Sequence, residues 1–360
     1  MTTRKTVKYA VLQNPGHNRV YFNSSGKLAK NELHALFSGS ITEIAGIAKI
    51  AEITEIKEEL FGGVEYITFL ANSALSGEAL TLLSRLSFVY AIFELREDLF
   101  FPVLKNRAYF FGEDLNMILK YSGKTNEIFT HMMINLAVFA SSFAFNLPGN
   151  LNLLDPVCGK GTTVFEGLIC GYNSFGIDIS EKLINEGSQF FKKYLETGKY
   201  KHSFKKEGIS GTGNDKTPFK SRRHLFELAK NKADQKENKS LLCEFIEGDA
   251  QNADKYYKKN TFHIIVGDLA YGIQHENNAN GGKMRNPVNL VSASLPVWTQ
   301  VLKPGGSVCL AWNTFLAKRG QMEDIFKENK LEISEPGEFG DFSHRVDQAI
   351  NRDIIIGVKK

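Results

Sequence analysis

Residues 153–163 read Leu-Leu-Asp-Pro-Val-Cys-Gly-Lys-Gly-Thr-Thr. A short apolar run ends in Asp155-Pro156, passes through a Gly-x-Gly turn and opens a helix at Thr162. Glycines let a backbone turn sharply and approach a ligand closely, and the first N–H groups of a helix have no partner inside it. The stretch therefore predicts a buried strand, a ligand-binding turn and a helix.

The acidic residue at the start of this turn limits the classes of ligand that the turn can bind. A dinucleotide-binding turn holds pyrophosphate, which the carboxylate of Asp155 would repel. A Walker A loop needs a Lys-Ser/Thr pair after its second glycine, and Thr162-Thr163 stand there instead. A carboxylate at this position suits the cationic amino group of a methionine moiety.

Three more acidic residues follow predicted strands in the same half of the chain. Asp178, in Gly-Ile-Asp, comes 23 residues after Asp155, and a carboxylate there can accept hydrogens from both ribose hydroxyls. Asp249, in Gly-Asp-Ala, is placed to bind an adenine amino group, with a helix N-cap as the alternative. Asp268 ends an apolar run where a substrate would meet the cofactor.

The second half of the chain has the rhythm of an α/β domain. Short apolar runs alternate with glycine turns and helical stretches, which is typical of a mainly parallel sheet. The runs expected to be strands are 151–154, 174–178, 245–248, 262–267, 307–312 and 353–358. We therefore predict an α/β fold, with a Rossmann-like domain over residues 151–360.

The first half predicts a small domain and a connector. Strand-like runs at 9–12, 19–22, 44–56, 64–71 and 88–95 flank helical spacing at 28–37 and 74–86. The order β-α-β-β-α-β over residues 1–100 is typical of an α+β ferredoxin-like domain. Residues 101–150 predict a connector and a long apolar helix over 125–145, stopped by Pro148-Gly149.

The composition excludes several classes of protein. Hydrophobic residues make up 42% and charged residues 23% of the chain, as in soluble globular proteins. The apolar run 132–147 is too short to span a bilayer, so we expect no membrane partner.

The four cysteines form no C-x-x-C pair and have no histidine cluster, so no metal site is expected. Few unpaired cysteines and no apolar signal core indicate a cytoplasmic protein.

A local excess of positive charge is hidden in the overall net charge of +4. Residues 192–239, called the basic arm here, hold 14 Lys/Arg and 6 Asp/Glu, a net of +8. Its middle, residues 208–216, is polar and glycine-rich and predicts a loop. A solvated loop is one interpretation of the arm. The other is phosphate binding, with five candidate cations: Lys205, Lys206, Lys220, Arg222 and Arg223.

The motifs together resemble a known family. Asp-Pro-x-x-Gly-x-Gly-Thr at 155–162, Gly-x-Asp at 176–178, Gly-Asp at 248–249 and Asp-x-x-Tyr-Gly at 268–272 follow one another as in Rossmann-like methyltransferases that act on amines. More narrowly, the chain is similar to THUMP-associated RNA methyltransferases, especially their tRNA guanine-N2 branch. The resemblance covers residues 105–360 and includes the segments 123–127, 343–346 and 352–355.

The resemblance implies transfer of a methyl group from S-adenosylmethionine to an exocyclic base amine, with guanine N2 in tRNA ahead of other targets. Asp268 would accept the amine hydrogens, and Tyr271 would stack on the base. A paired base would first have to leave its stack. The implied cofactor contacts come from the three strand ends: Asp155, Pro156, Cys158, Gly159, Gly161, Thr162, Asp178, Ile179, Asp249 and Ala250. Cys158 would contribute its backbone.

The chain departs from the family pattern in two places. Leu269-Ala270 stand where the family has two prolines, which stiffen the loop. Residues 1–100 are too short for a complete accessory domain plus a THUMP domain, and they match the ferredoxin-like part. Thr125-Asn126-Glu127 is expected to cap the long helix. Two other functions stay open: an adenine-N6 or cytosine-N4 methyltransferase of DNA or rRNA, and a nucleic-acid-binding protein without catalysis.

Overall fold

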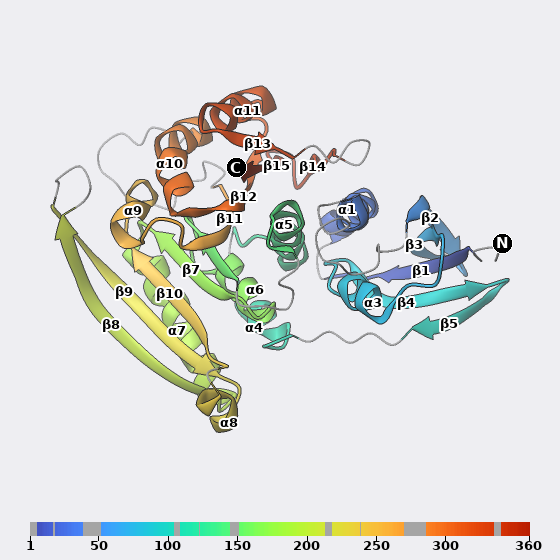
Figure 1. The fold of residues 1–360 in the computed structure, drawn as a ribbon, viewed down its shortest axis with the longest axis horizontal. Helices are drawn as coiled ribbons and strands as arrows, with labels where there is room; N and C mark the ends of the chain where they lie inside the picture. The colour runs from blue at the N-terminus through green and yellow to red at the C-terminus, as the bar shows by residue number, and fades with distance from the viewer. Residues whose placement is uncertain are drawn as a thin grey trace.

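Two β-sheets organise the chain, one from each half (Figure 1). The computed structural model describes residues 6–16, 19–38, 52–103, 109–121, 123–144, 151–212, 218–237, 239–269, 286–334 and 340–360. The N-terminal sheet has five strands and the C-terminal sheet has ten. The chain is therefore a mixed α/β protein, with its larger sheet where the sequence predicts the Rossmann-like domain.

The large sheet has a parallel centre and antiparallel flanks. Its parallel strands, in spatial order, are β12 (Leu302–Asn313), β11 (Phe262–Asp268), β6 (Asn152–Asp155), β7 (Asn173–Asp178) and β10 (Leu241–Glu247). Antiparallel strands extend both sides: β13 (Leu331–Ile333), β14 (His344–Arg345) and β15 (Asn351–Lys359) beyond β12, and β9 (Pro218–Ala229) and β8 (Lys201–Thr212) beyond β10. All six predicted strands exist, but the expected mainly parallel sheet is mixed.

Helices cover both faces of the parallel centre. Leu153 packs in one apolar cluster with helix α5 (Glu127–Ala140), while its neighbour Leu154 packs in another with α10 (Pro287–Val301). Strands buried on both faces read as continuous apolar runs, which is why the sequence reveals them. The other helices of this half are α4 (Asp114–Ile118), α6 (Thr162–Ile169), α7 (Glu181–Thr197), α8 (Lys232–Lys236), η2 (Ala250–Asn252), α9 (Ala253–Tyr256) and α11 (Arg319–Glu328).

The N-terminal sheet is antiparallel between all neighbouring strands. Its spatial order is β2 (Ile53–Phe61), β3 (Val64–Ala71), β1 (Val7–Gln13), β4 (Val89–Arg96) and β5 (Leu99–Val103). Two helices, α1 (Arg19–Ser38) and α3 (Gly77–Ser84), follow β1 and β3. The expected strand at 19–22 is wrong, because these residues begin α1; the β-propensity of Val-Tyr-Phe is a weak guide against tertiary packing. Residues 44–51 lie outside the described ranges.

The central part of the basic arm forms a long β-hairpin from β8 and β9. β8 and β9 pair from Lys201 opposite Ala229 to Thr212 opposite Pro218, and they carry the large sheet outward beyond β10 (Figure 1). The expected loop at 208–216 is therefore wrong for 208–212, and residues 213–217 lie outside the described ranges. The hairpin forms because the rings of Phe204 and Phe226 stack on each other and pack against α7, 4.6 Å between centroids.

Helix α5 joins the two halves and lies between the sheets in Figure 1. It is buried from Phe129 to Phe139, and one apolar cluster contains its side chains together with those of both sheets. The sequence predicted this helix over 125–145, and it begins at Glu127 and ends at Ala140. Pro148-Gly149 fall outside the described residues. Within the part of the chain that is described, no helix combines the length and apolarity needed to cross a membrane.

Candidate active site

Four acidic residues gather at the carboxyl ends of adjacent parallel strands. Asp155, Asp178 and Asp268 are the last residues of β6, β7 and β11, and Asp249 comes two residues after β10. The strands are in register at this edge, with Asp155 opposite Gly176 and Glu247 opposite Asp178. In open α/β sheets, ligands bind outside the carboxyl ends of the strands. This edge is therefore the place where the fold leads us to expect a ligand.

The turn after β6 depends on two glycines. Gly159 and Gly161 have φ angles of 54° and 99°, a left-handed conformation that favours glycine. A Cβ on Gly161 would also stand 2.8 Å from the ring of Phe245. The amide of Cys158 donates to the carbonyl of Ile177 at 2.9 Å, so the turn is fixed against β7. The backbone at this turn therefore lies close to the strand ends where a ligand would sit.

Asp155 is a buried carboxylate surrounded by negative charge. Its side chain is almost inaccessible, and its Oδ1 accepts a hydrogen bond from the amide of Val157 at 2.9 Å. Burial raises the pKa of Asp155 to about 7, and the charges of Asp178 and Asp268 act in the same direction. An adjacent cation would favour the charged form of Asp155. The turn is thus suited to a cationic group and poorly suited to phosphate.

Asp178 ties three segments of the edge together. Its Oδ2 accepts from the amide of Gly159 at 2.9 Å, and its Oδ1 accepts from the amide of Ser180 at 2.8 Å. Its backbone carbonyl accepts from the amide of Gly248 after β10. The next residue, Ile179, has 56% of its surface exposed. An exposed apolar side chain beside a carboxylate is consistent with one flat, apolar face of a ligand lying there.

Asp249 and Ala250 serve local structure. The Asp249 carboxylate accepts from the amide of Gln251 at 2.9 Å and caps η2, so the capping alternative is observed. Ala250 is buried, and its carbonyl accepts from the indole N–H of Trp298 at 2.9 Å. Both residues lie at the edge that carries the other three carboxylates.

Asp268 is held from two sides through one oxygen. The hydroxyl of Thr125 donates to its Oδ2 at 2.6 Å, and Nη2 of Arg352 lies 3.2 Å from the same oxygen. The guanidinium of Arg352 is buried and sits 4.5 Å from the ring centroid of Phe129. The expected capping role belongs to Asn126, whose side chain accepts from the amide of Phe129. Thr125 instead contacts the predicted catalytic carboxylate.

Leu269 is fixed in place directly after β11. It is buried, and its amide donates to the carbonyl of Ala311 at 2.9 Å. Proline has no amide hydrogen, so this hydrogen bond is available because Leu269 stands where the family has proline. The predicted catalytic Tyr271 and the neighbouring Ala270 lie outside the described residues.

Tyr121 is a residue at this site that the sequence did not single out. Its hydroxyl lies 2.8 Å from Oγ1 of Thr162, and the ammonium of Lys160 lies 4.8 Å from its ring centroid. Burial raises the pKa of Tyr121 to about 12, and the charges of Asp155 and Asp268 add to the effect. Tyr121 therefore contacts the start of α6 and lies within electrostatic range of Asp155 and Asp268. Residues 119–124 show no periodic pattern, so no sequence signal placed it there.

The basic arm has less unpaired charge than the sequence indicates. Three of the five candidate cations have acidic partners within the chain: Lys206 with Glu247, Arg222 with Glu181 and Glu247, and Arg223 with Glu244. Lys205 and Lys220 are exposed on the hairpin. Much of the predicted phosphate-binding charge is therefore used to dock the hairpin on the sheet and on α7.

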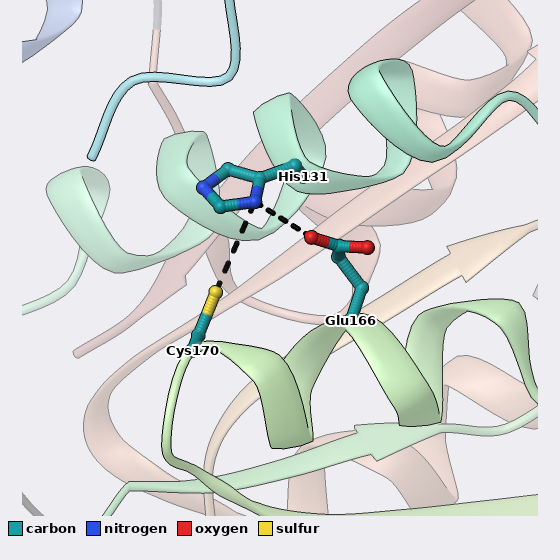
Figure 2. Close-up of side chains that lie close together, drawn as sticks. All are labelled: His131, Glu166 and Cys170. Carbon is teal, nitrogen blue, oxygen red and sulfur yellow. Dashed lines mark hydrogen bonds and ion pairs between the residues drawn. The ribbon is translucent and has the colours of Figure 1, made fainter. Parts of the chain in front are cut away.

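A second cluster of titratable groups lies between α5 and α6 (Figure 2). Nδ1 of His131 is 2.7 Å from Oε1 of Glu166 and 4.0 Å from Sγ of Cys170, and Nε2 is 2.8 Å from the carbonyl of Arg85. Burial alone lowers the pKa of His131, but Tyr109, Cys170 and Glu166 raise it well above its usual value. Because a carboxylate and a carbonyl both accept, the ring donates from both nitrogens. The cluster is a buried ion pair.

Comparisons with known proteins give fold-level likenesses. No protein-family model and no curated protein matches the sequence. The magnesium protoporphyrin IX methyltransferase of Synechocystis, solved with bound SAM, is 15% identical with a TM-score of 0.37, covering 69% of this chain and 90% of its own. A SAM-dependent methyltransferase of Methanosarcina mazei is 15% identical with a TM-score of 0.34, and the match covers 58% of this chain and 92% of that protein. A TehB-like SAM-dependent methyltransferase of Corynebacterium glutamicum is 13% identical with a TM-score of 0.33, and the match covers 59% of this chain and 81% of that protein. At these values the function has to be argued from the residues themselves.

Proposed function

We propose that this chain transfers a methyl group from S-adenosylmethionine to an exocyclic amine of a nucleic-acid base, with guanine N2 in tRNA as the first candidate. The observation that carries the proposal is the gathering of Asp155, Asp178, Asp249 and Asp268 at one sheet edge beside a two-glycine turn. Asp155, Asp178 and Asp249 suit a nucleoside that carries a positive charge, and Asp268 suits the amine that receives the methyl group.

The residues present fit the proposed cofactor. Asp155 would bind the ammonium of its methionine part, because a cation relieves the burial of that carboxylate. Asp178 would accept the ribose hydroxyls at the end of β7, where its carboxylate also accepts from the amides of Gly159 and Ser180. Ile179 offers an exposed apolar surface to the adenine, with Ala250 and Asp249 at the next strand end.

Asp268 would prepare the amine for attack. An exocyclic base amine is a poor nucleophile, because its lone pair is delocalised into the ring. A carboxylate that accepts an amine hydrogen favours a more pyramidal nitrogen, with its lone pair directed at the methyl group. When bound, S-adenosylmethionine supplies a methyl group activated by its sulfonium. The methyl group would take the place of one amine hydrogen, and Asp268 would accept the proton that the amine loses and pass it to water.

The nucleic acid would be held by the outer parts of the molecule. Lys205 and Lys220 on the hairpin would contact phosphates. The N-terminal unit, whose helices follow β1 and β3, would be a ferredoxin-like domain that contributes to RNA binding. Tyr271 would stack on the base. A cytoplasmic location belongs to the same proposal, since all four cysteines are free and buried.

A transfer assay tests this function. The protein is incubated with methyl-labelled S-adenosylmethionine and, separately, with unmodified tRNA, rRNA and DNA, and the nucleosides are identified by mass spectrometry. We expect label in N2-methylguanosine from tRNA. Label in N6-methyladenine or N4-methylcytosine from DNA or rRNA would move the substrate to the alternative class. Cofactor binding without transfer to any of the three would identify a nucleic-acid-binding protein without catalysis.

A further inference from the structure

We infer that Thr125 and Arg352 are positioning residues that fix the Asp268 carboxylate as a hydrogen-bond acceptor for the substrate amine. The inference rests on the proposed function and names two residues that act through Asp268. Thr125 precedes α5, Asp268 ends β11 and Arg352 begins β15, so three distant segments meet at one carboxylate. Neither Thr125 nor Arg352 belongs to the turn that would hold the cofactor.

The geometry fixes both the position and the rotation of the carboxylate. The Thr125 hydroxyl and Nη2 of Arg352 both contact Oδ2 of Asp268, at 2.6 Å and 3.2 Å. Two donors on one oxygen, from opposite segments, resist rotation of the carboxylate plane. A small displacement of such a group is costly to turnover.

The charges around Asp268 explain why an arginine is needed. Asp155 on β6 lies close enough for the two carboxylates to interact, and the charge of Asp268 helps to raise the pKa of Asp155. Arg352 is always protonated in proteins, and its charge beside Asp268 offsets the negative charge of these carboxylates. Tyr121 and His344 are titratable groups that also interact with Asp268.

His344 does not replace Arg352 as the cation. Burial and the charge of Arg352 lower the pKa of His344 to about 4, so its ring is neutral at physiological pH. Burial raises the pKa of Tyr121 to about 12, so its hydroxyl is neutral as well. Arg352 is therefore the cation placed on Asp268 among the residues that the structure describes. Its burial against Phe129 keeps the guanidinium at that position.

Four variants separate positioning from general structure. Thr125→Val removes the hydroxyl while keeping the shape, and Thr125→Ser restores it. Arg352→Gln removes the charge. Arg319→Gln is the matched control, because Arg319 pairs with Asp353, the neighbour of Arg352 on β15, at 3.0 Å. Thermal unfolding of all four verifies that each is folded before its kinetics are measured with labelled cofactor and unmodified tRNA.

We expect the substitutions to lower turnover while the affinity for the cofactor stays the same. Thr125→Val lowers kcat about tenfold, as for the loss of one hydrogen bond to a charged group, and Arg352→Gln lowers it by up to about 100-fold. The dissociation constant of S-adenosylmethionine stays within twofold in both, about the scatter of such measurements. Thr125→Ser recovers most of kcat, and Arg319→Gln behaves as wild type.

The failures of the two proposals are distinguishable. If the wild-type protein methylates no nucleic acid, the proposed function falls before any variant is compared. If the wild type is active and folded Thr125→Val and Arg352→Gln keep its kcat, the positioning role is overturned. A loss of cofactor affinity equal to the loss of kcat would also overturn it, because the residues would then act on the cofactor site.

Discussion

The amide of Gly159 donates to Oδ2 of Asp178 at 2.9 Å, so the turn after β6 is tied to the end of β7. The same carboxylate holds the amide of Ser180, the N-cap of α7, through its other oxygen. One side chain thus shapes the turn and offers acceptor sites at the edge. A change at Asp178 is expected to affect both the conformation of the turn and any nucleoside bound beside it.

We expect Asp178→Ala to weaken the binding of S-adenosylmethionine by at least about tenfold, because hydrogen bonds to a charged group are worth about 1.5–3 kcal/mol. Isothermal titration calorimetry measures this, and thermal unfolding reports the loss of the turn contacts. Glu332→Gln is the control, since Glu332 is an exposed carboxylate on β13 that pairs with Lys360. A dissociation constant equal to that of the wild type would contradict the assignment of Asp178 to the cofactor site.

The affinity for the cofactor is expected to depend on pH through Asp155. Its pKa is raised by burial from 3.8 to about 7, so the free protein holds this proton below neutral pH. An ammonium ligand needs the carboxylate, and binding therefore strengthens as the pH rises toward 7, by about tenfold per unit at the steepest. Above pH 8 the ligand amino group, with an ordinary pKa of about 8, loses its own charge.

Calorimetry between pH 5.5 and 8.5 tests that dependence. The account expects an optimum between pH 7 and 8 and proton release on binding at pH 6. Asp155→Asn is expected to weaken binding at pH 7.5 and to flatten the profile between pH 5.5 and 7. An equally steep profile in Asp155→Asn would show that another group controls the affinity.

The ion pair between His131 and Glu166 is expected to stabilise the fold. His131→Ala leaves the buried Glu166 carboxylate without its cation, which costs about 3–5 kcal/mol of unfolding free energy. The pKa of His131 is raised in the folded protein. Its contribution is therefore fully present below the ordinary value of about 6.5 and is lost as the pH rises through the folded value.

Urea unfolding at several pH values measures both effects. The difference in unfolding free energy between wild type and His131→Ala should shrink as the pH rises above neutral. His263→Ala is the comparison, because burial and Lys303 lower the pKa of His263 to about 4, and its ring is neutral throughout this range. If the difference in unfolding free energy between wild type and His131→Ala does not change between pH 6 and 10, this contradicts a protonated His131 in the folded protein.

The hairpin is expected to contribute to nucleic-acid binding through its exposed lysines. Lys205→Glu and Lys220→Glu should each weaken tRNA binding and lower the salt slope by about one unit if each contacts a phosphate. Lys327→Glu is the control, because Lys327 is an exposed lysine on helix α11 and does not belong to the hairpin. Filter binding across a salt series measures the slopes. Equal slopes for the hairpin variants and the control would remove the hairpin from the interface.

The sequence predicted the parallel centre because its strands are apolar on both faces and end in Gly or Asp. Leu153-Leu154-Asp155 and the run before Asp268 carry that signal in consecutive residues. The hairpin was missed because its lysines and glycines outnumber the few side chains that fix it, such as Phe204 and Phe226. The local composition correctly predicted an exposed, positively charged segment, but it wrongly predicted a loop in place of strands.

The partners of Asp268 could not be predicted. Thr125 lies 143 residues away in the chain from Asp268, and Arg352 belongs to a different strand. His131 is a polar residue in a largely apolar helix, and only the tertiary structure shows that Glu166 faces it. Contacts between distant segments carry no local periodicity, so spacing and composition cannot reveal them.

Substitution of Asp268 tests the central claim, in one experiment that measures both cofactor binding and methyl transfer to tRNA. We predict that Asp268→Ala binds S-adenosylmethionine as tightly as the wild type and loses at least about 100-fold in turnover, the lower end of what a proton-accepting side chain contributes. Wild-type turnover in this variant would contradict the assignment of the reaction to the sheet edge that Asp155, Asp178 and Asp268 share.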